Sequence, residues 1–337
     1  MSSTMEIKLQ NLDSIRDAIR LAGSGTKAGL SKSTGLSVAT CNNLLNEMFE
    51  QGELLQVDQD ESQGGRKASR FIYNKDYYHV LGIYVKIVQG VRNVGYSIAN
   101  ALGDIIEQEV LHPDWIDCEY LSNLFEQRLA RDPLIHSAAL AIPGNVYHGR
   151  VEYCDIHSLE GLDLQAVLEK KLHINVIVEN DMNMIAYGAY WADQYRENCL
   201  VAMDFPVDDA VGSGIVIDGK IYKGATRFAG ELAFALEEEG IPRTQQPVSK
   251  LSKSELFKIL VKSVMMVICV LNPDRIVLMC EALSEEDLPM IRDYCKKFVS
   301  EYHIPQIVLS RSFYDFCTAG MIRATLNSLR YQFRLTV

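Results

Sequence analysis

The alternation of β-rich and helical segments from Val80 onward constrains the fold of this chain more than any other feature. The first three expected strands, 80–88, 91–99 and 105–111, follow one another closely. Further strands are expected at 137–142, 176–179, 200–203 and 214–217, helices at 120–131, 164–172 and 182–191, and a turn at Asp218-Gly219. Because helices and sheets bury their apolar faces against one another, this order predicts α/β lobes over most of the chain.

The size and composition of the chain fit a globular protein of several domains. Its 337 residues exceed one ordinary core and suggest two or three domains, and the apolar share of 48% is typical of soluble proteins. No secretory signal is expected near Met1, and the longest apolar run, 259–271, is interrupted by Lys262 and too short to span a bilayer. The eight cysteines show no Cys-x-x-Cys spacing. We therefore expect reduced thiols, a cytoplasmic location and no membrane partner.

The first 76 residues carry a helix-turn-helix pattern. An apolar stripe predicts a first helix that ends at Gly23: Leu12, Ile15, Ile19 and Leu21. A short helical segment, 27–34, is followed by Gly35, which favours a helix end, and by Ser37, which favours a helix start. The next helix, about 38–50, is expected to turn five residues inward: Val38, Cys41, Leu44, Leu45 and Met48. Two short helices joined by a tight glycine turn form the helix-turn-helix pattern.

The outward face of the second helix carries residue types that read DNA bases. Its members are Ala39, Thr40, Asn42, Asn43 and Asn46, with Ser37 at the helix start. Asparagine can pair with adenine edges, and threonine or alanine can contact the methyl group of thymine. An ordinary solvated helix would more often carry Glu and Lys there. We expect this face to bind DNA, and a plain helix surface is the alternative.

A β-hairpin wing is expected after this helix. Residues 52–58 and 70–73 have the pattern of strands, and the loop between them contains Gln63-Gly-Gly-Arg-Lys67. Arg66 and Lys67 can meet phosphates or reach the minor groove, where arginine is favoured; a flexible linker with two cations is the alternative. The net charge of −11 argues against general nucleic-acid binding. Residues 1–76 contribute only −1 to it, which leaves a local DNA-binding face possible.

Three motifs between residues 142 and 231 resemble the sugar-binding half of the ROK family (repressors, open reading frames, kinases). They read Ile142-Pro-Gly-Asn-Val-Tyr147, Val176-Ile-Val-Glu-Asn-Asp-Met-Asn-Met-Ile-Ala-Tyr187 and Ala229-Gly230-Glu231, and the Gly-Gly-Arg-Lys segment is similar to the wing tip of ROK repressors. The resemblance implies an actin-like, hexokinase-like (ribonuclease H-like) fold of two lobes. It also implies that Gly144 and Asn145 frame a sugar, that Asn180, Asp181 and Glu231 contact its hydroxyls, and that Asp181 matches the general base of the kinases. In the alternative, Asn180 and Asp181 only cap a helix and Glu231 lies on a surface loop.

The segments with which kinases of this family hold ATP are changed in three places. Where the family has Asp-x-Gly-Gly-Thr, whose amides and hydroxyl cradle phosphate, this chain has Tyr84, Lys86, Ile87 and Val88. The second phosphate loop reads Val207-Asp-Asp-Ala-Val-Gly-Ser-Gly214, where the carboxylates of Asp208 and Asp209 would repel phosphate. The third segment, Asn272-Pro-Asp-Arg-Ile-Val-Leu278, continues into Met279-Cys280 instead of two glycines. Three losses in one site argue against kinase activity, and no cofactor is expected.

The zinc-binding segment of the family is also missing from the sequence. Phe234 stands where the family has a histidine, and residues 235–251 contain neither cysteine nor histidine. Even an open zinc site needs three such ligands. We therefore expect no bound metal.

Together these features predict a DNA-binding transcriptional regulator of the ROK type, a repressor without kinase activity. The expected domains are a winged helix-turn-helix (1–76), a first α/β lobe (77–190) and a second α/β lobe (191–337) whose C-terminal helix can return to the first. The expected partners are operator DNA, a sugar or sugar-derivative effector and further copies of the chain, as a dimer or tetramer, because a two-fold operator needs paired readers. Effector binding would change lobe closure and so the spacing of the two winged helices.

Two other readings remain open from the sequence. The first is a ROK-type sugar kinase with an atypical nucleotide site, which would use Asp181 as its base. The second is a regulator whose sugar cleft is inactive and which responds to a protein partner or to nothing.

Overall fold

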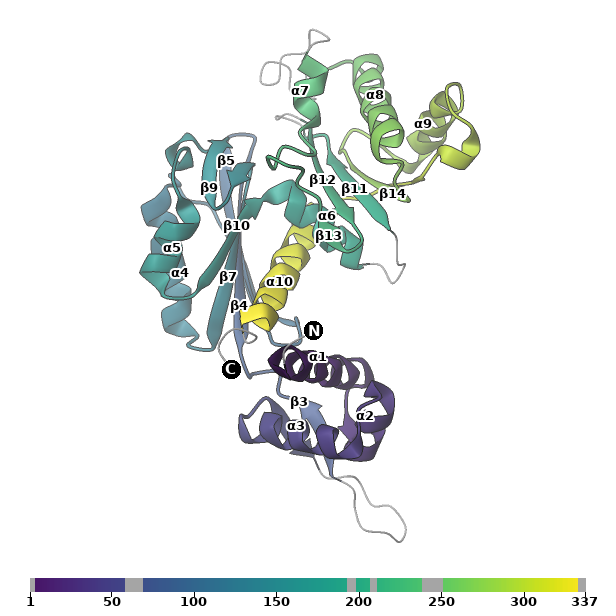
Figure 1. Ribbon diagram of the computed structural model, residues 1–337. Coiled ribbons are helices and arrows are strands. Elements are labelled where there is room, and N and C mark those ends of the chain that lie inside the picture. Colours follow the sequence, from purple (N-terminus) through teal and green to yellow (C-terminus); the bar gives the residue numbers. More distant parts are fainter. Residues whose placement is uncertain (1–3, 58–68, 193–197, 207–210, 238–250, 333–337) are drawn as a thin grey trace.

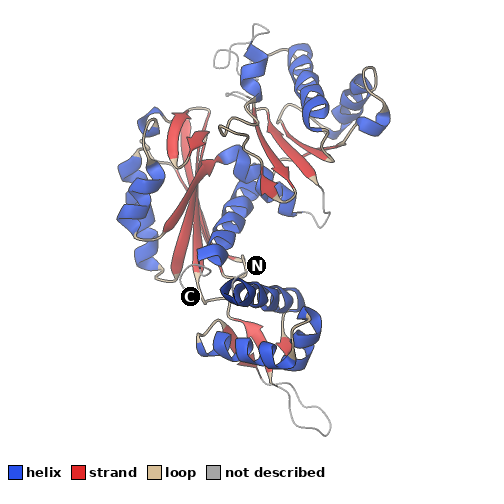
Figure 2. Cartoon of the chain, viewed as in Figure 1, coloured by secondary structure: helices blue, strands red, loops and turns tan. Residues whose placement is uncertain are grey.

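The structure is a computed structural model that describes residues 4–57, 69–192, 198–206, 211–237 and 251–332. It is a mixed α/β chain with an N-terminal helical part followed by two sheet-containing lobes, as the sequence predicts (Figures 1 and 2). The wing-tip residues Arg66 and Lys67, the acidic pair Asp208 and Asp209, and most of the 235–251 segment lie outside the described residues.

The N-terminal part consists of three helices and a small sheet. Its elements are α1 (Thr4–Ala22), β1 (Gly25–Thr26), α2 (Lys27–Thr34), α3 (Val38–Glu50), β2 (Leu54–Val57) and β3 (Arg70–Tyr73), with the strands in the order β1-β3-β2. Gly35 closes α2 with a φ of 72°, and the Ser37 hydroxyl accepts the Thr40 amide at 3.1 Å to begin α3. This arrangement is a winged helix.

A buried ion pair fastens α1 to the sheet of the winged helix. The Arg16 guanidinium donates from Nε to Glu53 Oε1 at 2.6 Å and from Nη2 to Oε2 at 2.9 Å. The Tyr73 hydroxyl donates to the same carboxylate at 2.9 Å. Because the Glu53 side chain is only 2% exposed, these partners compensate a charge that would be costly to bury alone.

Two residues expected in this core are exposed. Leu21 is 93% exposed because it follows Ile19 by two positions, about 200° around the helix. Val38 is 59% exposed because it lies in the first turn of α3, whose core residues begin only at Cys41. The strand β1 was not expected; with two residues it is too short to show a pattern of its own.

The first lobe is a five-stranded sheet with two helices on its outer face. Its elements are β4 (His79–Val88), β5 (Val91–Asn100), β6 (Ile105–Leu111), α4 (Cys118–Arg131), β7 (Ile135–Ile142), β8 (Gly144–Tyr147), β9 (Arg150–Cys154), α5 (Leu164–Leu172) and β10 (Asn175–Asn180). The strand order is β10-β7-β4-β5-β6, with β4, β7 and β10 parallel. Leu121 and Phe125 of α4 and Leu164 and Leu168 of α5 pack on this sheet. The carboxyl ends of β7 and β10 therefore lie at one edge, where β8 and α6 begin.

The second lobe repeats this layered plan. Its elements are β11 (Cys199–Asp204), β12 (Gly212–Ile217), β13 (Lys220–Ile221), α7 (Leu232–Glu237), α8 (Lys253–Leu271), β14 (Arg275–Met279), α9 (Leu288–Cys295) and β15 (Gln306–Leu309). The strand order is β13-β12-β11-β14-β15, and α8 and α9 pack on one face. Asp218 and Gly219 form the expected turn, with φ of 50° and 73°.

Two helices, α6 (Asp181–Ala192) and α10 (Phe313–Gln332), lie between the two sheets (Figure 1). The helix α6 packs on β11 and β12 of the second sheet, whereas α10 packs on β4 and β7 of the first. The helices cross at two glycines: a Cβ on Gly188 would stand 1.9 Å from the Phe316 carbonyl oxygen, and one on Gly320 would stand 1.9 Å from that of Met184. Each helix thus packs on the sheet of the lobe to which it does not belong in sequence. The expected domain boundary between residues 190 and 191 therefore remains a proposal.

The far end of α10 reaches the winged helix. Ile322, Leu326 and Leu329 belong to the same buried cluster as Leu9, Leu12 and Phe71 of the winged helix. The helix thus spans the distance from the interlobe region to the winged helix. No helix in the described parts of the chain is long and apolar enough to cross a membrane.

Candidate functional site

The outer face of α3 presents most of the expected DNA-reading residues to solvent. Ser37, Ala39, Asn43 and Asn46 are exposed, and Thr40 is half-buried. Lys27 of α2 donates to Asn46 Oδ1 at 2.8 Å, which orients that amide. The exposed Val38 adds an apolar side chain to the same end of the helix.

Asn42 differs from its neighbours on this helix. It is half-buried, and its Oδ1 atom is buried without a hydrogen-bond partner. A buried acceptor that faces inward cannot contact a base edge, and leaving it unpaired costs free energy. In this conformation Asn42 is a poorer candidate for base recognition than the exposed Asn43 and Asn46.

A cleft between the lobes gathers all five residues expected at the sugar site. Gly144, Asn145, Asn180, Asp181 and Glu231 line one hollow of about 90 Å³. They come from the carboxyl ends of β7 and β10 in the first lobe and from the segment before α7 in the second. Because small-molecule sites usually measure about 300–1,000 Å³, the cleft is narrow here and must widen to admit a sugar.

Close backbone packing fixes the loop at Gly144. A Cβ at this position would lie 2.2 Å from the Tyr153 carbonyl oxygen, so only glycine fits. Asn180 holds the loop as well, because its Nδ2 donates to the Gly144 carbonyl at 2.9 Å while its Oδ1 accepts the Asn183 amide at 3.0 Å. The side chain of Asn180 therefore both caps α6 and positions the loop at Gly144.

Asn145 lines the cleft and carries a buried acceptor with no hydrogen-bond partner. Its Nδ2 donates to the Arg227 carbonyl of the second lobe at 3.0 Å, whereas its Oδ1 is buried without a hydrogen bond. Buried acceptors are nearly always paired. Because this atom is buried here, as Oδ1 of Asn42 is, a ligand hydroxyl could pair with it only after the cleft opens.

Two carboxylates complete the polar wall of the cleft. Asp181 is only 7% exposed and accepts its neighbour's amide, that of Met182, through Oδ1 at 2.8 Å. Glu231 follows Gly230, whose φ of 98° suits glycine and whose carbonyl accepts the Ser213 hydroxyl at 2.6 Å. Together the carboxylates offer several acceptors for hydroxyl groups.

Sequence reasoning missed four polar residues of this cleft. Tyr153 donates to Asp155 at 3.1 Å from the β8–β9 hairpin, and Lys86 of β4 forms an ion pair with Asp204 of β11 at 3.2 Å. The two residues of the ion pair lie 118 positions apart. No motif links Lys86 to Asp204, so only the folded chain shows that they meet.

The Lys86–Asp204 pair stands at the β4 position where the kinase motif would place its phosphate-binding residues. The Lys86 ammonium also lies 3.2 Å from the centre of the Phe313 ring. Met279 and Cys280, which replace the family's glycines, are 3% and 4% exposed. Beyond the ion pair lies a second hollow of about 380 Å³, which shares Lys86, Asp204 and Pro206 with the first.

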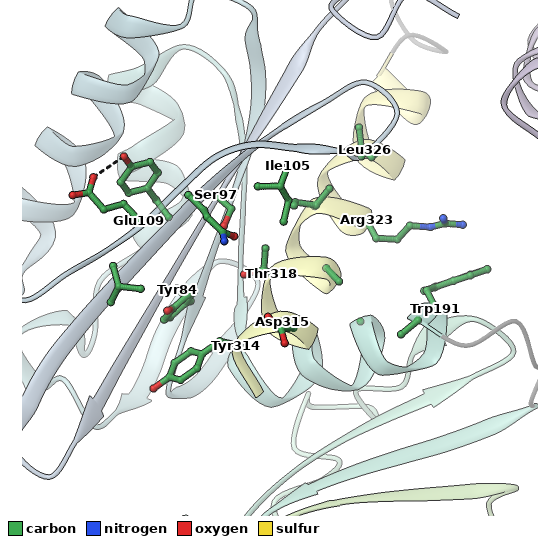
Figure 3. Close-up of a pocket in the computed structure, with 18 of the residues that line it drawn as sticks. Tyr84, Ser97, Ile105, Glu109, Trp191, Tyr314, Asp315, Thr318, Arg323 and Leu326 are labelled. Atoms are coloured by element: carbon green, nitrogen blue, oxygen red, sulfur yellow. Dashed lines mark hydrogen bonds between the residues drawn. The ribbon is translucent and has the colours of Figure 1, made fainter. Parts of the chain in front are cut away.

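A larger hollow of about 720 Å³ is separate from the cleft (Figure 3). It lies along α10, with Tyr314, Thr318, Ile322 and Leu326 on one side and residues of β5 and β6 on the other. None of the expected sugar ligands lines it.

Phe234, at the position where the family has a zinc-binding histidine, is one member of an aromatic pair. Phe234 packs against Phe228 with ring centres 4.9 Å apart. Among the described residues, no group of three or more histidines, cysteines, aspartates or glutamates is arranged to hold a metal ion.

Comparison with known proteins finds a family match within the chain. Residues 90–239 match the model of the ROK family. The xylose repressor of Bacillus spizizenii is 23% identical over 218 residues, which cover 61% of this chain and 55% of the repressor. The N-acetyl-D-glucosamine kinase of Vibrio cholerae is 35% identical over 98 residues, 28% of this chain and 32% of the kinase. The chain spans about half the length of the curated repressors that it matches.

A solved structure shares the whole fold. The crystal structure of a ROK family transcriptional regulator, a homologue of the E. coli MLC protein, superposes with a TM-score of 0.72 at 16% identity, and the alignment covers 98% of this chain and 100% of that one. The winged helix and both lobes therefore recur together in a known fold. Residues 90–239 thus resemble the ROK family, and the chain shares its two-lobed fold and its N-terminal winged helix with the ROK regulator structure.

Proposed function

We propose that the protein is a transcriptional repressor that binds operator DNA through its winged helix and responds to a sugar bound between its lobes. The observation that carries the proposal is the shared core in which α10 joins the winged helix to the lobes. The names of its relatives agree, since they include xylose repressors and the N-acetylglucosamine repressor of E. coli.

DNA binding would centre on the first turns of α3. Ala39, Thr40, Asn43 and Asn46 are accessible there, and Val38 can contact a thymine methyl group. The wing-tip cations Arg66 and Lys67 would contact phosphates. A single winged helix reads half of a two-fold site, so the proposal includes a dimer or tetramer.

The sugar would lie against Asn145, Asp181 and Glu231. Once the cleft widens, the unpaired Oδ1 of Asn145 would accept a ligand hydroxyl, and the two carboxylates would accept others. Asn180 would act mainly by holding the Gly144 loop in place. Because Asn145 and Glu231 belong to different lobes, a ligand that contacts both favours one degree of lobe closure over others.

Kinase activity is not part of the proposal. A kinase of this fold needs glycine-rich backbone to approach the nucleotide phosphates, and here Lys86, Met279 and Cys280 take those positions. The Lys86 ammonium is already neutralised by Asp204 and covered by the Phe313 ring. Asp181 keeps the place of a general base, but the described residues at Lys86, Met279 and Cys280 form no glycine-rich loop that would hold a phosphoryl group beside it.

The helices α6 and α10 offer a route from the cleft to DNA. Asp181 begins α6, and α6 crosses α10 in close backbone contact at Gly188 and Gly320, so we expect movement of one helix to displace the other. The other end of α10 lies in the core of the winged helix. A shift of α6 on sugar binding would therefore move α10 and reorient the winged helix.

Selection from random DNA with the purified chain tests the DNA half of the proposal. A two-fold consensus is expected, and Asn43→Ala should lower the affinity for it and relax the preference at one base pair, at a cost of about 1–3 kcal/mol. Leu55→Ala, another exposed substitution in the same unit, is the matched control. Absence of any selected sequence would contradict the proposal.

A thermal-shift screen with xylose, glucose, N-acetylglucosamine, their phosphates and Mg-ATP tests the proposed sugar response and the proposed lack of kinase activity. A sugar that binds the native state raises the midpoint, and the increase should vanish in Asn145→Ala. Sugar-dependent turnover of ATP that is lost in Asp181→Asn would instead establish a kinase.

A further inference from the structure

A second hollow adjoins the proposed sugar cleft. It measures about 380 Å³ and lies at the carboxyl ends of β11, β14 and β15, against the tip of the β4–β5 hairpin. Lys86, Asp204 and Pro206 line both hollows, so the two spaces meet at the ion pair. A ligand in the narrow cleft can extend past this pair into the wider space.

The charges of the second hollow balance one another. Its described lining carries two cations, Lys86 and Arg311, and two carboxylates, Asp204 and Glu281. Lys86 and Asp204 already form an ion pair, and Arg311 donates to the Leu283 carbonyl at 3.0 Å. A polyanion would gain little attraction from such a lining and would meet two carboxylates. The hollow therefore suits a neutral polar ligand better than a nucleotide.

Two aromatic side chains, Phe313 and Tyr314, line this hollow. Tyr314 is 42% exposed, and its ring packs on Tyr84 with centres 5.2 Å apart, which holds it in place. Phe313 lies beside it under the Lys86 ammonium. A fixed ring that presents an apolar face and a polar hydroxyl matches a sugar ring, which has an apolar CH face and a rim of hydroxyl groups.

We propose that the second hollow holds the second ring of a neutral disaccharide, or an equivalent glycoside, whose first ring lies in the cleft at Asn145 and Asp181. The second ring would lie against Tyr314 and exchange hydrogen bonds with Arg311 and Glu281. The Lys86–Asp204 pair would face the linkage, with one donor and one acceptor. This inference rests on the proposed sugar response and specifies its ligand class.

Isothermal titration calorimetry with matched sugars tests the inference on the full chain. The probes are xylose against xylobiose, glucose against cellobiose, and N-acetylglucosamine against N,N′-diacetylchitobiose. In at least one of these three pairs, the disaccharide should bind at least about tenfold more tightly than the monosaccharide, a gain in binding free energy of about 1.4 kcal/mol. Tyr314→Ala and Arg311→Ala should each remove most of this gain and leave monosaccharide affinity unchanged. Tyr302→Ala, at a surface tyrosine that is 92% exposed, should keep the full gain.

The outcomes separate this inference from the proposed function. A monosaccharide that binds while no disaccharide binds more tightly overturns the inference and leaves the sugar response intact. A gain that survives both Tyr314→Ala and Arg311→Ala also overturns it. If Mg-ATP competes with the disaccharide but not with the monosaccharide, the hollow is a nucleotide site and the inference fails. If no sugar of either size binds, the inference and the proposed sugar response fail together.

Discussion

The crossing of α6 and α10 predicts that Gly320→Ala destabilises the protein. A Cβ there would stand 1.9 Å from the Met184 carbonyl oxygen and 3.1 Å from the Gly188 amide nitrogen. Since an ordinary contact begins near 3.4 Å, the helices must separate by about 1.5 Å. Overpacking costs about 1–3 kcal/mol, and a backbone oxygen cannot rotate aside as a side chain can. We therefore take the upper end of this range, about 3 kcal/mol; the higher helix propensity of alanine offsets about 1 kcal/mol of it, which leaves a net loss of about 2 kcal/mol.

Urea unfolding followed by far-UV circular dichroism measures this loss. Ala319→Gly is the matched control, because Ala319 is exposed on the same helix and the change there reports propensity alone, at about 1 kcal/mol. If Gly320→Ala instead raised stability by about 1 kcal/mol, as in an unconstrained helix, the tight crossing and the coupling route built on it would be refuted.

Three further predictions concern the ion pairs and thiols. Glu53→Ala should cost about 3–5 kcal/mol, because it leaves the Arg16 charge buried, and hydrogen exchange should accelerate throughout α1. At pH 9, iodoacetamide should modify the exposed Cys269 and spare Cys154, since burial raises the pKa of the Cys154 thiol to about 12; peptide mass spectrometry checks this, and equal labelling would contradict it. In a double-mutant cycle, Lys86→Met and Asp204→Asn should cost less together than the sum of the single changes; strict additivity would show that the pair contributes nothing.

Local patterns were enough to predict most of the elements. The strand β6 and the helix α5 have the bounds expected from the sequence, and α2 ends at Gly35 and α3 begins after Ser37, the two predicted capping residues. Periodicity and capping are properties of neighbouring residues, so the sequence displays them directly. The family motifs likewise located five residues that one cleft brings together.

Features that depend on distant parts of the chain could not be predicted. The exposure of Leu21 and Val38 reflects where the core of the winged helix ends, and the inward orientation of Asn42 depends on the packing around α3. The Lys86–Asp204 pair joins two strands of different lobes. The sheet on which α6 or α10 packs depends on the chain topology, and the side-chain pattern of a single helix does not indicate it.

The most direct test of the account is the operator affinity of the full chain with and without the sugar that stabilises it. Fluorescence anisotropy with the selected DNA gives one affinity ratio, and calorimetry of the sugar with and without DNA gives the other. We predict that sugar changes operator affinity by about 5- to 150-fold, that DNA changes sugar affinity by the same factor, and that Asn145→Ala abolishes both effects. An operator affinity that stays unchanged at saturating sugar would show that the cleft does not control the winged helix and would contradict the central claim.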